Sequence, residues 1–174
     1  METGDYGVST ASGFDNSNVL TVAWTGILCT DPAMTYVSIR KERYSYDIIK
    51  NTKEFVINLT TEDLVKATDT AGVKSGRNVD KFKLLNLTKE KATTVSCPMV
   101  KESPVNIECK LEEIKELGSH DMFIAKITAV NVDEKYIDET GKFDLEKCNL
   151  IAYSHGAYYT LGKKLGKFGF SVKK

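Results

Sequence analysis

The sequence has few cysteines, histidines and prolines, and this scarcity argues against several classes of protein. Its four cysteines, Cys29, Cys97, Cys109 and Cys148, stand singly with no CxxC pair, so neither a zinc site nor a redox dithiol is expected. With two histidines, a metal site built from several histidines is not expected either, and we predict no metal ligands. No proline-rich or low-complexity linker divides the chain, so we predict a single domain over residues 1–174.

Charge of one sign and long apolar runs are also lacking. The 24 Lys and Arg residues balance 24 Asp and Glu residues, so the formal net charge is zero. This balance argues against a protein that coats nucleic acid, or one that a basic patch holds on a membrane surface. No apolar run approaches the roughly 18 residues of a membrane span, and the start shows no basic-then-apolar leader. We therefore predict a cytoplasmic protein with no nucleic-acid or membrane partner.

Familiar catalytic motifs are missing as well, and β-prone runs take their place. GxSxG, HExxH and GxxxxGK[ST] do not occur, so hydrolase and P-loop functions have no support. The clearest strand-like runs are NVLTVAWTGIL (18–28), MTYVSI (34–39) and EFVINL (54–59), and two more follow near 105–111 and 122–132. Without regular βαβ alternation, this pattern predicts a mainly β protein with peripheral α-helices and a closed or sandwiched antiparallel sheet.

Helices are expected only between these strands. Ser45 is a good N-cap for a short helix over residues 46–50, and Thr60 or Thr61 is expected to cap a helix that ends near Ala71. Residues 151–172 form a tail that is rich in aromatics and glycine.

The first group of residues with chemical potential follows the second strand-like run. Ser38 and Arg40 stand at its end, and Arg43 and Ser45 stand at the predicted helix start. A helix N-terminus offers free N–H groups, and arginine guanidinium groups bind phosphate oxygens in a bidentate fashion. Together they predict a phosphate site without a glycine-rich loop. The alternative is a pair of surface arginines in ion pairs with neighbouring acids such as Glu42.

Two further groups are weaker when taken alone. The loop Lys74-Ser75-Gly76-Arg77, followed by Lys81, offers a hydroxyl and three cations that can complete an anion site, or it is simply a solvated loop.

The third group contains Thr21, Ala23, Trp24 and Thr25 on a predicted strand. Small and hydroxyl residues beside the only tryptophan let a flat ring approach the backbone, although a tryptophan in the core is the favoured explanation when this group is taken alone.

In this order, the segments resemble the flavin reductase-like, FMN-binding split-barrel family, in its flavoredoxin-like branch. The matching stretches are NVLTVAWTGILCTDP (18–32), VSIRKERYSYDII (37–49), EFVINL (54–59), GVKSGRNVDKF (72–82), SPVNIEC (103–109), GSHDMFIAKI (118–127) and LGKKLGKFGFS (161–171). Several motifs in one order are more specific than any one of them. One departure is the polar start METGDYG (1–7), where the family usually has a proline-containing apolar strand.

The resemblance implies a six-stranded antiparallel split β-barrel, and a homodimer that holds FMN at the subunit interface. It also implies cofactor contacts, which fall into four sets along this chain. The flavin ring is expected to lie near Thr21, Ala23, Trp24, Thr25 and Cys29, and the ribityl chain and phosphate are expected to lie near Ser38, Arg40, Arg43 and Ser45. Asn58 is expected to make a polar contact to the flavin. The phosphate end is expected to be closed by Ser75, Gly76 and Lys81. Cys29 either tunes the ring or merely packs, and packing is favoured.

The function implied by the resemblance is that of an FMN-dependent oxidoreductase, with no catalytic side chain because the flavin carries the chemistry. NAD(P)H is the expected donor, and a free flavin or a redox protein is the expected acceptor. The alternative is a non-enzymatic FMN-binding electron-transfer protein without NAD(P)H activity of its own. A β-barrel module for RNA or protein is a third interpretation, against which the balanced charge counts.

The tail and the histidines leave smaller questions open. Aromatic residues such as Tyr158 and Phe168 either cover a flavin, for instance that of a partner subunit, or pack in the core and at a dimer interface. His155 is a candidate for an approach to the flavin or substrate, and His120 is expected to be solvated in a hairpin turn.

Overall fold

The computed structural model describes residues 6–11 and 14–172. The atypical segment 1–7 therefore lies largely outside the described residues, and only its last two positions enter the first strand. The strands of the main sheet are β1 (Tyr6–Ala11), β2 (Ser17–Val22), β3 (Thr25–Thr30), β4 (Ala33–Ile39), β5 (Glu54–Leu59), β8 (Val105–Glu116) and β9 (Asp121–Val132). The remaining elements are α1 (Tyr44–Thr52), α2 (Val65–Val73), α3 (Lys81–Leu84), the short pairs β6 (Lys89–Glu90) with β7 (Met99–Val100) and β10 (Ile151–Ser154) with β11 (Ala157–Thr160), and three 3₁₀ turns, η1 (Glu134–Tyr136), η2 (Leu145–Cys148) and η3 (Phe170–Val172).

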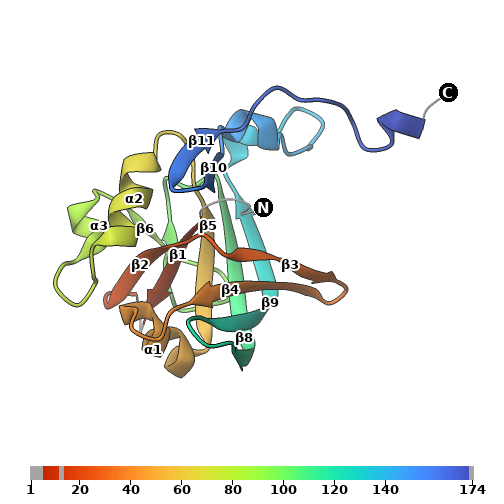
Figure 1. The fold of residues 1–174 in the computed structure, drawn as a ribbon. Helices are drawn as coiled ribbons and strands as arrows, with labels where there is room; N and C mark the ends of the chain where they lie inside the picture. The colour runs from red at the N-terminus through yellow and green to blue at the C-terminus, as the bar shows by residue number, and fades with distance from the viewer. Residues whose placement is uncertain (1–5, 12–13, 173–174) are drawn as a thin grey trace.

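The main sheet is antiparallel and curls on itself (Figure 1). Its strands are ordered β2-β1-β5-β8-β9-β4-β3. Only Ala23 and Trp24 separate β2 from β3, so the first and last strands of this order are covalent neighbours. The backbone N–H of Ser38 in β4 donates to the Trp24 carbonyl at 2.9 Å across the same junction. The two edges of the sheet therefore meet and form a barrel.

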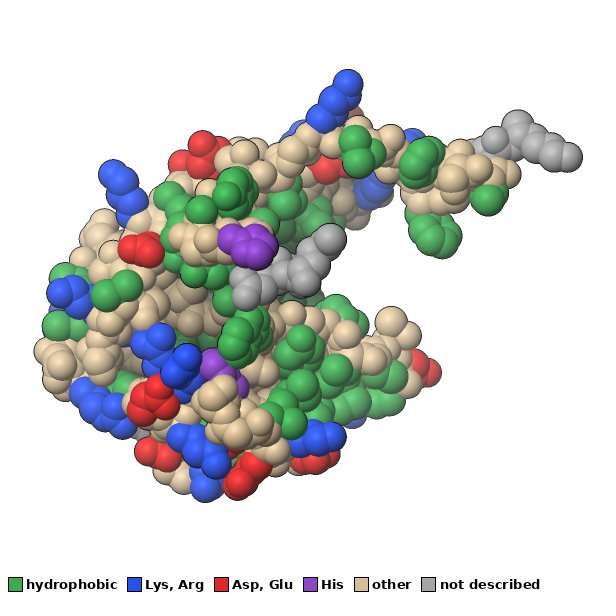
Figure 2. Space-filling view, viewed as in Figure 1, with side chains coloured by type: hydrophobic (Ala, Val, Ile, Leu, Met, Phe, Trp, Pro, Cys, Tyr) green, Lys and Arg blue, Asp and Glu red, His purple; other side chains and the backbone are tan. Residues whose placement is uncertain are grey.

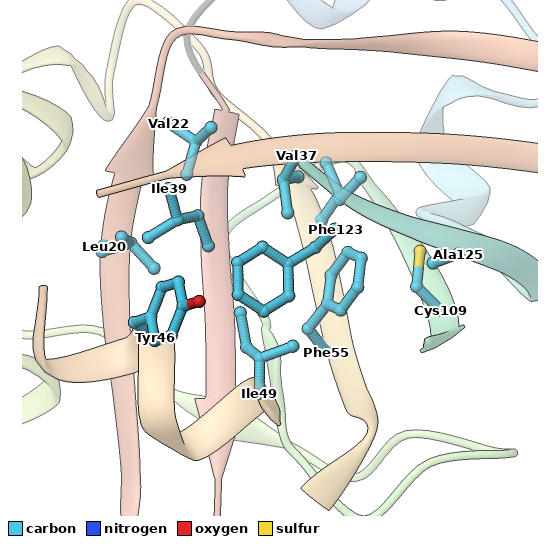
Figure 3. Close-up of a cluster of buried hydrophobic side chains, with 11 residues drawn as sticks. Leu20, Val22, Val37, Ile39, Tyr46, Ile49, Phe55, Cys109, Phe123 and Ala125 are labelled. Carbon is cyan, nitrogen blue, oxygen red and sulfur yellow. The ribbon is translucent and has the colours of Figure 1, made fainter. Parts of the chain in front are cut away.

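The interior of the barrel is filled by one cluster of apolar side chains (Figure 3). Alternate residues of the strands point inward, so Val37 and Ile39 of β4 face the rings of Phe55 and Phe123. Helix α1 closes one end of the barrel with Tyr46, whose ring lies edge-on to Phe123 with the centroids 5.0 Å apart. This packing fixes the position of α1, and with it the residues at the start of the helix.

Several expectations about local structure need correction. The run 18–28 is divided at Ala23 and Trp24 into β2 and β3, so the main sheet has seven described strands where the resemblance implied six. Ser45 is not the N-cap of α1, because the helix begins at Tyr44, two residues before the predicted start, with Arg43 at the cap position. The Ser45 hydroxyl accepts a hydrogen bond from Asn18 Nδ2 at 2.7 Å instead.

Near the end of the chain, β10 and β11 form a hairpin for which no strand was predicted. Its two-residue turn is His155-Gly156, and both residues have positive φ, 49° and 82°. Such a turn matches the twist of the flanking strands. Beyond it, residues 161–172 extend away from the barrel (Figure 1).

Candidate functional site

A basic cavity of about 360 Å³ lies where α1 begins, beside the loop before α3. Its lining residues are Asn18, Leu20, Arg40, Glu42, Arg43, Tyr44, Ser45, Lys74, Ser75, Gly76 and Lys81. Four of these residues are cations and one is an acid, so the cavity favours an anion. Six residues predicted from separate parts of the sequence, Arg40, Arg43, Ser45, Ser75, Gly76 and Lys81, meet here. Figure 2 shows the hollowed face, with Lys and Arg side chains gathered at one side of the hollow.

Lys81 is a buried cation with a neutral partner. Its side chain is 3% exposed, and Nζ donates to the Ala71 carbonyl at 2.6 Å. It forms no ion pair with any other residue that the structure describes. Burial, together with the nearby Arg43, lowers the pKa of Lys81 to about 8. A buried ammonium group without a counter-ion is destabilised, and an anion in the cavity would relieve that cost.

Arg43 is held at the cavity wall by the neighbouring backbone. Its Nη1 donates to the Gly72 carbonyl at 2.9 Å, and its backbone N–H donates to the Arg40 carbonyl at 3.1 Å. Arg40 behaves differently, because it pairs with Glu42 at 3.6 Å on an exposed surface. The alternative expectation of a surface ion pair therefore holds for Arg40, whereas Arg43 has no such pair among the described side chains.

The shape of the basic cavity depends on Gly76. A Cβ atom at this position would meet Tyr44 Cδ1 at 2.7 Å and would lie even closer to Asn18 Oδ1. Asn18 in turn donates to Ser45, so strand β2, helix α1 and the loop at Gly76 are packed against one another. Only glycine lets the loop backbone approach this closely.

An aromatic cavity of about 290 Å³ adjoins the basic cavity and shares Leu20, Arg40 and Arg43 with it. The other lining residues are Thr21, Val22, Ala23, Trp24, Ser38, Ile39, His120 and Tyr153. Three residues predicted near the flavin ring, Thr21, Ala23 and Trp24, line this cavity, and so does Ser38, which was predicted around the ribityl chain and phosphate. Trp24 is 42% exposed, so the only tryptophan of the chain is not a core residue.

His120 is not simply solvated as expected, because it packs against Trp24 with the ring centroids 4.1 Å apart. Burial and the charges of Arg40 and Arg43 lower the pKa of His120. Asp121 holds the turn that contains His120, because its buried carboxylate accepts hydrogen bonds from Tyr46 Oη at 2.6 Å and from the Leu117 N–H at 3.3 Å. The bond from Tyr46 is the main reason that the pKa of Asp121 is lowered.

Three predicted residues line neither cavity. Thr25 Oγ1 donates to the Tyr36 carbonyl at 2.5 Å, and Asn58 Oδ1 accepts from the Val100 N–H at 2.9 Å inside the protein. Cys29 lies on β3, where its thiol contacts the Asp31 carbonyl at 3.3 Å. These contacts hold strands and loops together, and they place the three side chains outside the walls of both cavities.

Sequence reasoning missed several lining residues, among them Asn18, Leu20, Tyr44 and Tyr153. Tyr153 stands in β10, far along the chain from the motifs, so no local pattern pointed to it. His155 lies in the exposed turn of the same hairpin and lines neither cavity.

The chain is similar to known proteins in sequence and in structure. A family model described as the flavin reductase like domain matches residues 2–162. The chain belongs to this family. A protein of Archaeoglobus fulgidus is 32% identical over 149 residues, which cover 86% of this chain and 83% of that protein.

Solved structures confirm the predicted flavoredoxin-like branch and the split-barrel class. Flavoredoxin of Desulfovibrio vulgaris (Miyazaki F) matches with a TM-score of 0.89 and 35% identity, over 99% of this chain and 93% of that chain. A flavin reductase with a split barrel domain from Shewanella frigidimarina matches with a TM-score of 0.83 and 24% identity, over 95% and 85% of the two chains. This second likeness concerns the fold alone.

Among the described residues, no helix has the length and apolar character needed to cross a membrane. The same residues contain no group of three or more His, Cys, Asp or Glu side chains that could hold a metal ion.

Proposed function

We propose that this protein binds FMN across the two joined cavities and acts as a flavin reductase-like oxidoreductase. The observation that carries the proposal is the continuity of a cation-lined cavity with an aromatic cavity, through the shared residues Leu20, Arg40 and Arg43. A flavin mononucleotide has the same polarity, with a phosphate at one end and a flat ring at the other.

The donor set of the basic cavity fits a phosphate group. Arg43, Lys74 and Lys81 supply positive charge, and Ser75 supplies a hydroxyl donor beside the close approach at Gly76. Arg43 and Lys81 are already held by backbone carbonyls, so binding orders few side-chain torsions. The chain's part at this end is to neutralise the phosphate and to fix the cofactor's position.

The aromatic cavity is assigned to the ring, which supplies the redox chemistry when it is bound. Ala23 and Thr21 offer small side chains and backbone groups along one wall, and Trp24 with His120 forms another. The wall at Trp24 is open to solvent, which leaves room for a second reactant. These residues orient the ring and leave one approach free.

NAD(P)H is the electron donor in this proposal, and a free flavin or a redox protein is the acceptor. The sequence has no GxGxxG fingerprint, so a nicotinamide would meet the ring through the open side of the aromatic cavity. The second candidate is an electron-transfer protein without NAD(P)H activity, and the likeness to a flavoredoxin favours it.

The proposal includes a homodimer and a single flavin reductase-like domain over residues 1–174. The hairpin of β3 and β4 supports the homodimer, because Ile27 is 65% exposed on it and Leu28 beside it is also exposed, close in sequence to Trp24. An exposed apolar face next to the proposed ring site is suited to a second copy that would complete the site. A cytoplasmic location stays a prediction.

The test combines the visible spectrum of the purified protein, chromatography of any released cofactor and the addition of NAD(P)H. A yellow protein that releases FMN and bleaches with NAD(P)H supports the reductase. A yellow protein that ignores NAD(P)H supports the electron carrier. A colourless protein that takes up neither FMN nor riboflavin contradicts the flavin assignment.

A further inference from the structure

The C-terminal tail carries the most exposed large apolar side chains of the described residues. Residues 161–172 extend from β11 away from the barrel (Figure 1). Leu165 is 91% exposed, Phe168 is fully exposed, and Phe170 and Val172 are largely exposed. The tail is therefore not packed in the core of its own chain, and it presents apolar surface that a partner would bury.

The tip of the tail has a defined local structure. The Phe170 N–H donates to the Lys167 carbonyl at 2.9 Å. The ring of Phe170 lies over Gly166, where an added Cβ would come within 2.6 Å of Cδ1. This turn uses Phe170 to cover the tail's own backbone and leaves Phe168 pointing into solvent. A folded turn that displays one aromatic side chain is suited to insertion into a pocket.

The charge of the tail is opposite to that of the rest of the chain. Its lysines are Lys163, Lys164, Lys167, Lys173 and Lys174. The segment 161–174 contains no acid, and the whole chain is neutral, so residues 1–160 contain five more acids than bases. The tail and the body of a second copy are therefore complementary in charge.

A pocket of matching chemistry lies at the root of the tail. This root pocket has a volume of about 270 Å³, and its lining includes Glu62, Leu145, Glu146, Leu150 and Leu161. Its leucines suit an aromatic side chain, and its two acids suit the lysine next to that side chain. Glu146 contacts Lys164 of the same tail, whereas exposed Glu62 forms no ion pair with another described residue.

We propose that two copies of the chain exchange their tails, with Phe168 of each copy in the root pocket of the other and Lys167 beside Glu62. A two-fold axis through the middle of the tails places the root of one beside the tip of the other, so each contact is made twice. The stretch from Gly162 to Phe168 spans at most about 20 Å, which brings the axis close to the body of each copy. This inference rests on the proposed homodimer and identifies the segment that joins it.

The first test measures the dimer dissociation constant by sedimentation in the wild-type protein and in Phe168→Ser. We expect the constant to rise at least tenfold, because the variant removes two apolar contacts from each dimer. Leu84→Ser is the matched control, since Leu84 is 51% exposed on α3 and lies outside the tail and the root pocket, and it should leave the constant unchanged.

The second test exchanges charges at low salt, where the attraction between the two side chains is least screened. Lys167→Glu alone and Glu62→Lys alone should each weaken self-association severalfold, because both variants place like charges together twice. An equimolar mixture of the two variants should form a heterodimer with near wild-type affinity, because each contact then joins opposite charges. Lys66→Glu, on an exposed face of α2, is the control for a general charge effect.

The outcomes separate the tail from the homodimer and from the cofactor. A Phe168→Ser protein that dimerises as tightly as wild type overturns the tail exchange but does not contradict the homodimer. The same holds if the mixture of Lys167→Glu and Glu62→Lys fails to recover the wild-type dimer affinity. A wild-type protein that stays monomeric at tens of micromolar overturns both the tail exchange and the homodimer. That result would overturn both even if the tail were found to bind anionic vesicles or another protein. FMN binding is measured separately, from the visible spectrum, so its outcome tests the cofactor assignment and not the tail exchange.

Discussion

The two cavities of the proposed site are built in different ways. The basic cavity is bounded by packed elements, with Lys81 and Ser45 buried and the Gly76 loop in contact with Asn18. The aromatic cavity is bounded by connections, because Trp24 lies between two strands and His120 lies in a hairpin turn. One end is rigid and suited to holding a cofactor, and the other is open and suited to admitting a reactant.

This difference gives four predictions, three of which compare the binding of FMN with that of riboflavin, which lacks the phosphate. The largest effect is expected for Arg43→Ala, which should weaken the binding of FMN by about ten- to a hundredfold, the range expected for loss of a hydrogen bond to a charged group. The affinity for riboflavin, measured by the same fluorescence titration, should change little. Arg77→Ala is the matched control, because Arg77 bonds the Glu42 carbonyl outside the cavity wall. Equal losses for both flavins would show that the basic cavity does not hold the phosphate.

Gly76→Ala should weaken the binding of FMN by about tenfold or more, since overpacking of this size costs about 1–3 kcal/mol. The added methyl group would push on Tyr44 and Asn18 and deform the basic cavity. Titration with FMN gives the affinity, and the melting temperature shows whether the fold is intact. A variant that binds FMN within threefold of wild type would mean that the loop moves freely, and the rigidity of this end would be refuted.

The affinity for FMN should fall by about tenfold between pH 7 and pH 9, because the pKa of Lys81 is lowered to about 8 in the protein without an anion. A bound phosphate stabilises the ammonium form and raises that pKa. Protonation of Lys81 therefore accompanies binding, and the gain is present below pH 8 and lost as the pH rises above it. Lys81→Met should bind weakly at every pH in this range, and riboflavin should show no such dependence.

Trp24→Ala is expected to have the smallest effect. It should weaken the binding of FMN and of riboflavin alike by about two- to tenfold, the range expected for loss of an aromatic contact. The melting temperature should hardly change, because Trp24 is exposed and lies outside the core cluster. A loss confined to FMN would place the phosphate at this end and reverse the assignment of the two cavities.

The sequence predicted those parts of the fold whose signals are local. Strand β5 has the predicted bounds, Glu54–Leu59, because a short apolar run between turn residues has one clear interpretation. The hairpin of β10 and β11 was missed, although a turn signal was present in Gly156. No strand was predicted on either side of this turn, because neither strand shows an apolar alternation that marks a buried face.

The candidate site was predictable where each residue carries its own chemistry. Arg43, Ser75 and Lys81 were singled out as cations or hydroxyls in loops and at expected helix starts, and the structure gathers them. Asn18 was missed because its importance comes from Ser45, which is 27 positions away. Asn58 was expected to face the flavin but is used within the protein, since strand alternation alone does not tell which inward polar residue has a backbone partner.

The position of Trp24 also gives the protein a built-in optical probe. The chain has one tryptophan, and that residue lines the aromatic cavity in contact with His120. Emission excited in the indole band therefore originates beside the proposed ring site, without contributions from indoles elsewhere. A flavin seated there would accept the excitation energy and quench the emission, so occupancy could be followed in the native protein without a label.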